Sequence, residues 1–181
     1  DHDHENVAKA LQNIQFVSSG TKVLTFIQEE IDVITKYLSP DKHMLEWGAG
    51  GSTLFFSTLV KTYTSIEHDS DWYNDVLKVK PLNVLLHHVP NNLPRTTPTD
   101  PIQFKDYINY VDTLNKKFDL VLIDGRARPQ CAEKVIPYLS DDAVVFIHDF
   151  WQRPEYHWVF DMYEEVESIK NGQSIVALRL K

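Results

Sequence analysis

The sequence predicts an α/β fold in which helices cover both faces of a mostly parallel sheet. Five short apolar segments alternate with helical segments, which indicates crossover connections between parallel strands. Two of the apolar segments, "LVLI" and "AVVFI", are continuously apolar, which is typical of strands buried on both faces. Near the end of the chain, Asn171-Gly172 separates two further strand-like segments and predicts a hairpin. The last strand should therefore run antiparallel to its neighbour.

The first predicted element is a helix. From Thr21 to Leu38 apolar residues recur at steps of three and four, the pattern of an amphipathic helix. Pro40 ends it, because proline disfavours helical geometry in the residue before it. The segment 1–20, which opens with the polar run "DHDHEN", is expected to be flexible, and 21–181 to form a single domain.

The later elements follow from short apolar runs and the segments between them. Strands are predicted at His43–Trp47, Tyr63–His68, Asn83–Val89, Phe118–Asp124 and Ala143–Asp149. Helices are predicted at Thr53–Leu59, Asp71–Val79, Ile102–Leu114, Gln130–Leu139 and Glu155–Met162.

Composition and charge exclude several classes of function. The net charge of -8 over 181 residues argues against a broad surface for nucleic-acid phosphates, which would need clustered Lys and Arg. No apolar run approaches the roughly 20 residues that span a bilayer, and no signal peptide opens the chain. A cytoplasmic location is favoured. A secretory one is the alternative if a segment before Asp1 has been removed. The sequence leaves the oligomeric state open.

A glycine-rich turn follows the first predicted strand. In "LEWGAGGST", Leu45–Thr53, bare backbone can approach a ligand closely, and a parallel sheet binds ligands beyond the carboxyl ends of its strands. Glu67 ends the next strand, where a carboxylate can accept hydrogen bonds from both hydroxyls of a ribose. A nicotinamide-binding turn has the pattern G-x-G-x-x-G, and here Thr53 stands where the third glycine belongs.

The order and spacing of these motifs resemble the class I methyltransferases that depend on S-adenosylmethionine. Glu46, Gly48 and Gly50 are similar to the acidic-x-Gly-x-Gly signature of that family, although Ser52 stands where many members carry a third glycine. The resemblance implies a Rossmann-like seven-stranded sheet and S-adenosylmethionine as the cofactor. It places the first acid near the ammonium and methionine end and the second acid on the ribose. The residues expected to bind the cofactor are Glu46, Gly48, Ala49, Gly50, Ser52, Thr53, Glu67 and His68.

Within that family, "FIHDFWQR" after an "LIDG" strand resembles the plant glucuronoxylan methyltransferases, which methylate a hydroxyl of a sugar acid. This resemblance implies O-methylation of a small molecule, a sugar or a uronic acid. The partner is then a small molecule or a glycan.

Polar residues at two predicted strand ends suggest how a proton leaves the methyl acceptor. Asp124 ends one strand and His148-Asp149 the next, so one imidazole and two carboxylates are expected around one crevice. Because histidine takes up a proton near neutral pH, His148 is the expected base, with Asp149 orienting it or contacting the substrate. The alternatives are a divalent metal held by the same three residues and a buried structural histidine.

Two further features suggest substrate contacts. Arg126 and Arg128 could pair with a carboxylate of an acidic substrate, or form ion pairs within their loop. Trp151 could stack on a sugar or aryl acceptor, or pack in the core.

Two other functions stay open at this point. A nicotinamide-dependent oxidoreductase has a similar sheet, but Glu46, the Ser52-Thr53 pair and the predicted hairpin disfavour it. A non-catalytic protein that keeps the fold is the other alternative, and the acids retained at both cofactor positions and both strand ends make it the weaker one.

Overall fold

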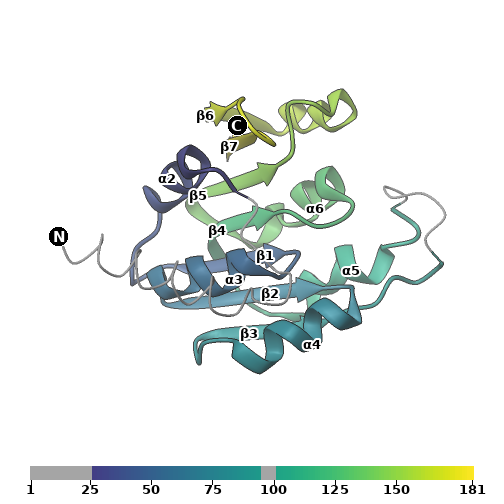
Figure 1. The fold of residues 1–181 in the computed structure, drawn as a ribbon. Helices are drawn as coiled ribbons and strands as arrows, with labels where there is room; N and C mark the ends of the chain where they lie inside the picture. The colour runs from purple at the N-terminus through teal and green to yellow at the C-terminus, as the bar shows by residue number, and fades with distance from the viewer. Residues whose placement is uncertain (1–25, 95–100) are drawn as a thin grey trace.

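A computed structural model describes residues 26–94 and 101–181 and shows a seven-stranded sheet with helices on both faces (Figure 1). The strand order is β3-β2-β1-β4-β5-β7-β6. β7 runs antiparallel to β5 and β6, and the other neighbouring strands are parallel. This confirms the predicted α/β class and its antiparallel last strand. The strands are β1 (His43–Trp47), β2 (Thr62–Glu67), β3 (Val84–His88), β4 (Phe118–Ile123), β5 (Leu139–His148), β6 (Tyr163–Ile169) and β7 (Ile175–Leu180).

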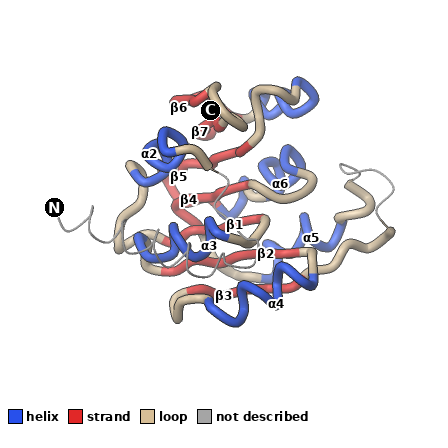
Figure 2. Tube along the Cα trace, in the orientation of Figure 1, coloured by secondary structure: helices blue, strands red, loops and turns tan. Residues whose placement is uncertain are grey.

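The helices lie where the sequence predicts them, but several are shorter (Figure 2). The α-helices are α2 (Gln28–Thr35), α3 (Gly51–Phe56), α4 (Ser70–Val79), α5 (Lys105–Asn109) and α6 (Arg128–Lys134). Short 3₁₀ helices continue three of them, at Ser57–Leu59, Tyr110–Thr113 and Ile136–Tyr138, and a fourth covers Pro154–Asp161. The predicted helix at 155–162 is therefore a 3₁₀ helix.

The central strands bury both faces, because side chains alternate along them. On β4, Val121 and Ile123 face α5 and α6, whereas Leu120 and Leu122 face α2 and α3. β5 repeats this alternation. The two hydrophobic clusters therefore lie on opposite faces of one sheet, as continuous apolar strands require.

β5 begins earlier than predicted. Leu139 pairs with Phe118, but Leu120 pairs with Val144, so β5 carries extra residues in a bulge. Asp142 adopts a left-handed conformation there, with φ 62°. The predicted helix at 130–139 is correspondingly too long, because its last residue belongs to the strand.

α2 ends at Thr35, before Pro40 requires it. Tyr37 and Leu38 donate backbone hydrogen bonds to Ile34 and Thr35, so the chain tightens into a 3₁₀ turn. Residues 1–20, predicted to be flexible, and residues 21–25 of the predicted helix lie outside the described residues.

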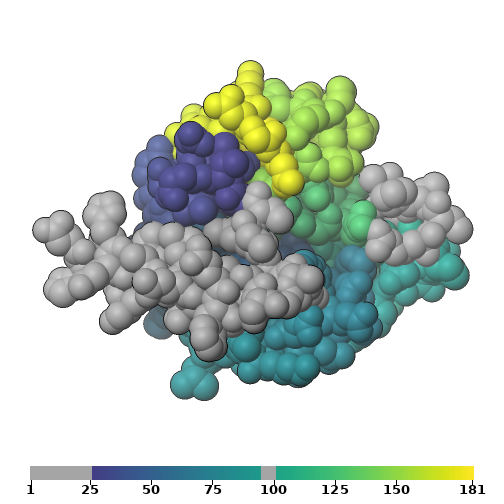
Figure 3. Space-filling view, in the orientation of Figure 1, coloured from purple at the N-terminus to yellow at the C-terminus, as the bar shows by residue number. Residues whose placement is uncertain are grey.

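α2 also lies against the C-terminal hairpin, where the purple and yellow surfaces meet in Figure 3. Lys36 and Tyr37 both contact the carboxylate of Glu167 on β6, at 2.8 and 2.7 Å. None of the helices within 26–94 and 101–181 has the length and apolar character to cross a membrane.

Candidate functional site

A cavity of about 350 Å³ opens at the carboxyl ends of β1, β2 and β4. The strand order reverses between β1 and β4, and this is where an open α/β sheet binds its ligand. The residues that line the cavity are Phe26, Gly48, Ala49, Gly50, Gly51, Ser52, Glu67, His68, Trp72, Asp124, Gly125, Arg126, Arg128 and Gln173.

The glycine turn forms one wall of this cavity. Gly48 has φ +97°, a conformation that favours glycine, and a Cβ atom there would lie 2.8 Å from the carbonyl oxygen of Asp124. Gly50 is extended, and a Cβ there would approach only Trp72, at 3.9 Å. Gly48 therefore serves the close packing of the β1 and β4 ends, while Gly50 leaves bare backbone on the cavity wall.

Glu67 lies at the end of β2 with its carboxylate fixed in place. Its Oε1 accepts the backbone N–H of Ala49 at 2.9 Å, and its Oε2 accepts that of Asp69 at 2.8 Å. Burial raises the pKa of Glu67 from 4.5 to about 7, although these two donors lower it. Each oxygen keeps a second lone pair, so the carboxylate can accept two further hydrogen bonds from a ligand in the cavity.

Glu46 lies behind the glycine turn and does not line the cavity. It is fully buried, and four hydroxyl groups donate to its carboxylate: Ser52, Thr53 and Tyr63 at 2.5 Å, and Ser65 at 2.8 Å. Burial raises its pKa from 4.5 to about 7, against the lowering effect of these donors.

The hydroxyl of Thr53 links this carboxylate to the turn, because it also accepts the N–H of Gly50 at 3.0 Å. Glu46 and Thr53 thus fix the turn from inside the protein. Of the predicted cofactor residues, Gly48, Ala49, Gly50, Ser52, Glu67 and His68 line the cavity, and Glu46 and Thr53 support it.

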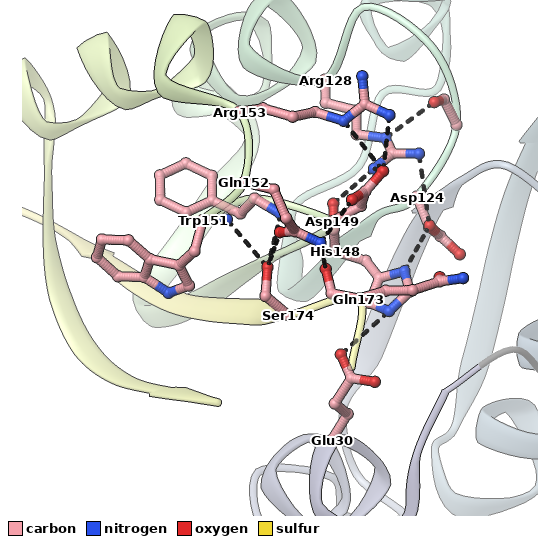
Figure 4. A network of polar contacts seen from close by, with 12 residues as sticks. Glu30, Asp124, Arg128, His148, Asp149, Trp151, Gln152, Arg153, Gln173 and Ser174 are labelled. Carbon is pink, nitrogen blue, oxygen red and sulfur yellow. Dashed lines mark hydrogen bonds and ion pairs between the residues drawn. The ribbon is translucent and has the colours of Figure 1, made fainter. Parts of the chain in front are cut away.

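Asp124 and His148 come together as predicted, but only Asp124 lines the cavity (Figure 4). Nδ1 of His148 lies 2.9 Å from Oδ1 of Asp124. Its Nε2 lies 3.1 Å from Oε2 of Glu30, a residue of α2 that sequence reasoning missed. The imidazole is 1% exposed, and the ring of Phe26 packs against it with 4.1 Å between centroids.

Asp149 turns away from this pair. It adopts a left-handed conformation, with φ 56°, and its Oδ2 accepts two hydrogen bonds from Arg153, at 3.0 and 2.8 Å. Asp124, His148 and Asp149 therefore do not form the metal-ligand set considered from the sequence. Among the described residues, no three or more His, Cys, Asp and Glu side chains are grouped so as to hold a metal ion.

The two predicted substrate arginines differ in placement. Arg128 is held by the protein: its Nε donates to the carbonyl of Gly125 at 3.0 Å, and one terminal nitrogen donates to the carbonyl of His148 at 2.6 Å. Arg126 and Arg128 both line the cavity. Trp151 lies outside the cavity lining, packed against Phe150 and Phe160 with Lys170 over its ring.

Six residues at or near the cavity were not predicted from the sequence. Gly51 and Gly125 each adjoin a predicted site residue, whereas no sequence pattern marks Trp72, in α4, or Gln173, after the hairpin turn, as a site residue. Phe26 and Glu30 lie on the apolar face of the first helix segment. Glu30 carried a usable signal, because a charged residue three positions after Ile27 falls on the buried stripe.

The strand order, the antiparallel β7 and the helices on both faces define the Rossmann-like α/β fold of methyltransferases. Solved structures share it. A methyltransferase-like protein from Silicibacter pomeroyi is 22% identical, with a TM-score of 0.68 over 88% of this chain and 89% of that one. A candidate caffeoyl-CoA O-methyltransferase from Staphylococcus aureus is 13% identical, with a TM-score of 0.67 over 98% and 95% of the two chains.

The N-methyltransferase NodS from Bradyrhizobium japonicum, solved with S-adenosyl-L-homocysteine, is 12% identical, with a TM-score of 0.55 over 94% and 97% of the chains. No protein-family model matches the sequence, and the search of curated proteins gives no match. These similarities establish the fold. The resemblance to plant glucuronoxylan methyltransferases rests on the sequence motif and stays a prediction.

Proposed function

We propose that the protein is an S-adenosylmethionine-dependent methyltransferase. The observation that carries this proposal is the carboxylate of Glu67, held by two backbone N–H groups at the wall of the cavity. It can accept both hydroxyls of a ribose, and the bare backbone at Gly50 leaves room for the rest of the cofactor. His68 and Trp72 add aromatic surface to the same cavity.

The residues present fit this cofactor better than a dinucleotide. Glu46 places a carboxylate directly behind the turn, where a pyrophosphate would need positive potential. S-adenosylmethionine supplies a methyl group on a positively charged sulfur, and its transfer to a hydroxyl leaves the electron pair of the broken bond on sulfur. The chain's own residues then have to hold the acceptor in line and remove the hydroxyl proton.

We further propose that the acceptor is a hydroxyl of a small molecule, such as a sugar or a uronic acid. Arg126 and Arg128 line the cavity beside Asp124, so a carboxylate on the acceptor would meet positive charge close to a group that can take a proton.

Ligand-dependent thermal unfolding tests the cofactor. S-adenosylhomocysteine should stabilise the protein by an amount that grows with its concentration, about 2.7 kcal/mol at 100 times its Kd. Glu67→Ala should lose this stabilisation, whereas Glu164→Gln, an exposed acid on β6, should keep it. Stabilisation by NAD⁺ and not by S-adenosylhomocysteine would favour an oxidoreductase, and no effect of either ligand would favour a non-catalytic protein.

Isotope-labelled S-adenosylmethionine tests the acceptor. Label should pass to saccharides that contain glucuronic acid, and Arg126→Ala should raise the KM for them. Transfer to neutral hydroxyl compounds alone would leave the methyltransferase assignment standing and remove the acidic acceptor.

A further inference from the structure

Three ionisable side chains lie in a row that ends at the cavity: Glu30 on α2, His148 at the end of β5 and Asp124 after β4 (Figure 4). Glu30 and His148 are 0% and 1% exposed. Neither Oε2 of Glu30 nor Nε2 of His148 has a hydrogen-bond partner among the described residues, so the 3.1 Å ion pair is the polar contact that each atom has.

This arrangement is costly if it serves stability alone. Removing Glu30 and His148 from water has a large desolvation cost, and apolar residues of similar size often stabilise a protein as well or better. The other oxygen of Glu30, Oε1, accepts the N–H of Ile27 at 3.0 Å at the start of α2. A glutamine could make that bond without a charge, so the helix end does not require a carboxylate.

The placement of His148 prevents it from receiving a proton from a ligand in the cavity. Both ring nitrogens already face carboxylate oxygens, and Phe26 covers the ring. Asp124 is different: His148 and Arg128 contact only its Oδ1, at 2.9 and 3.8 Å, and the residue lines the cavity. Oδ2 has no hydrogen-bond partner among residues 26–94 and 101–181.

Asp124 is held through one of its two oxygens. Nδ1 of His148 makes the hydrogen bond to Oδ1 of Asp124, while Nε2 faces Glu30 on the other side of the ring. Arg128 adds a positive charge beside the same Oδ1, and Asp149 faces that arginine at 3.5 Å. His148 and Arg128 therefore orient the Asp124 carboxylate and leave Oδ2 to accept a proton from a ligand in the cavity that Asp124 lines.

We infer that Glu30 is a positioning residue, which holds His148 against Oδ1 of Asp124 so that Oδ2 of Asp124 takes the proton from the methyl acceptor. This inference rests on the proposed methyltransferase function. In the step, the O–H bond of the acceptor breaks, its electron pair stays on oxygen, and the proton moves to Oδ2. Glu30 and His148 touch neither substrate nor cofactor.

Nitrogen NMR of the His148 ring tests the arrangement in ligand-free protein. The wild-type ring should show a slowly exchanging proton on Nδ1, in the hydrogen bond to Asp124. Glu30→Ala should make this proton exchange faster, because no carboxylate then holds the Nε2 side of the ring. Glu29→Ala makes the same change at an exposed neighbour in α2 and should leave the exchange as in the wild type.

Asp124→Ala tests the hydrogen bond from the other side, should Glu30→Ala fail to fold, and should lose the slowly exchanging proton on Nδ1. An Nδ1 proton that exchanges as slowly in Glu30→Ala as in the wild type, or that stays protected in Asp124→Ala, would overturn the inference.

Binding of S-adenosylhomocysteine separates this inference from the proposed function. By calorimetry, the Kd of Glu30→Ala should stay within twofold of wild type, because Glu30 does not line the cavity. With a methylated acceptor in hand, Glu30→Ala should lower kcat at least tenfold and change KM less than twofold. Absence of binding to every form refutes the proposed function, whereas normal binding with unchanged kcat refutes the role of Glu30 alone.

Discussion

Replacing Glu46 with glutamine should make the stability of the protein less dependent on pH. Glu46 is fully buried, and its pKa is raised from 4.5 to about 7, so the folded protein holds this proton more tightly than the unfolded chain does. The wild-type protein should therefore lose unfolding free energy as the pH rises from 4.5 through 7. The difference between these two values corresponds to about 3 kcal/mol.

Urea unfolding at several pH values between 5 and 8 measures this effect. The unfolding free energy of the wild type should fall relative to Glu46→Gln by most of about 3 kcal/mol across this range. Comparison with Glu46→Gln is necessary because the pKa of Glu67 is also raised to about 7, so Glu67 also lowers the unfolding free energy as the pH rises. Glu164→Gln, an exposed acid, should follow the wild type. Parallel curves for wild type and Glu46→Gln would refute the reasoning.

Further variants test the turn, the cavity and the loop after β5. Gly48→Ala should lower the unfolding free energy by at least about 1 kcal/mol, because φ is +97° and a backbone carbonyl lies 2.8 Å from the new Cβ. Gly50→Ala should fold normally, because the nearest atom to its new Cβ lies 3.9 Å away. Equal losses of unfolding free energy in the two variants, measured with urea, would contradict this prediction. Glu67→Ala leaves the buried N–H of Ala49 and the part-buried N–H of Asp69 without this acceptor, and should cost at least about 1–3 kcal/mol for the buried group, measured by the same unfolding. Asp149→Ala should cost about 1 kcal/mol more in thermal unfolding than Asp149→Asn, because φ is 56° and asparagine tolerates that conformation; no difference would argue against backbone strain there.

Much of the fold could be predicted because each of the five parallel strands has a recognisable local sequence pattern. Each is a short apolar run with polar or glycine residues at its ends, and β1 has the predicted bounds. The bulge at the start of β5 could not be predicted, because it depends on how Phe118 pairs with Leu139 across the sheet. The short 3₁₀ segments at the ends of the helices could not be predicted either, because tertiary packing and not the spacing of apolar residues determines where the α-helix ends.

The candidate site could be predicted where it depends on strand ends alone. Gly48 and Asp124 follow parallel strands and Glu67 is the last residue of one, and these strands end at one edge of the sheet. The partner of His148 could not be found this way, because α2 brings Glu30 to it from a distant part of the chain. The pairing of Asp149 with Arg153 was also not predicted, because Asp149 adopts a left-handed conformation and its side chain does not continue the alternation of β5.

The position of β7 also has a consequence for biosynthesis. β5 pairs with β4 on one side and with β7 on the other, and the hydroxyl of Ser174, just before β7, accepts the N–H groups of Phe150 and Trp151. While the ribosome is still adding the hairpin, one edge of β5 has no partner strand, and the N–H groups of Phe150 and Trp151 lack the hydroxyl of Ser174. A nascent chain is then open to association with other chains through that edge. Protection of this edge should come only when β7 is inserted beside β5.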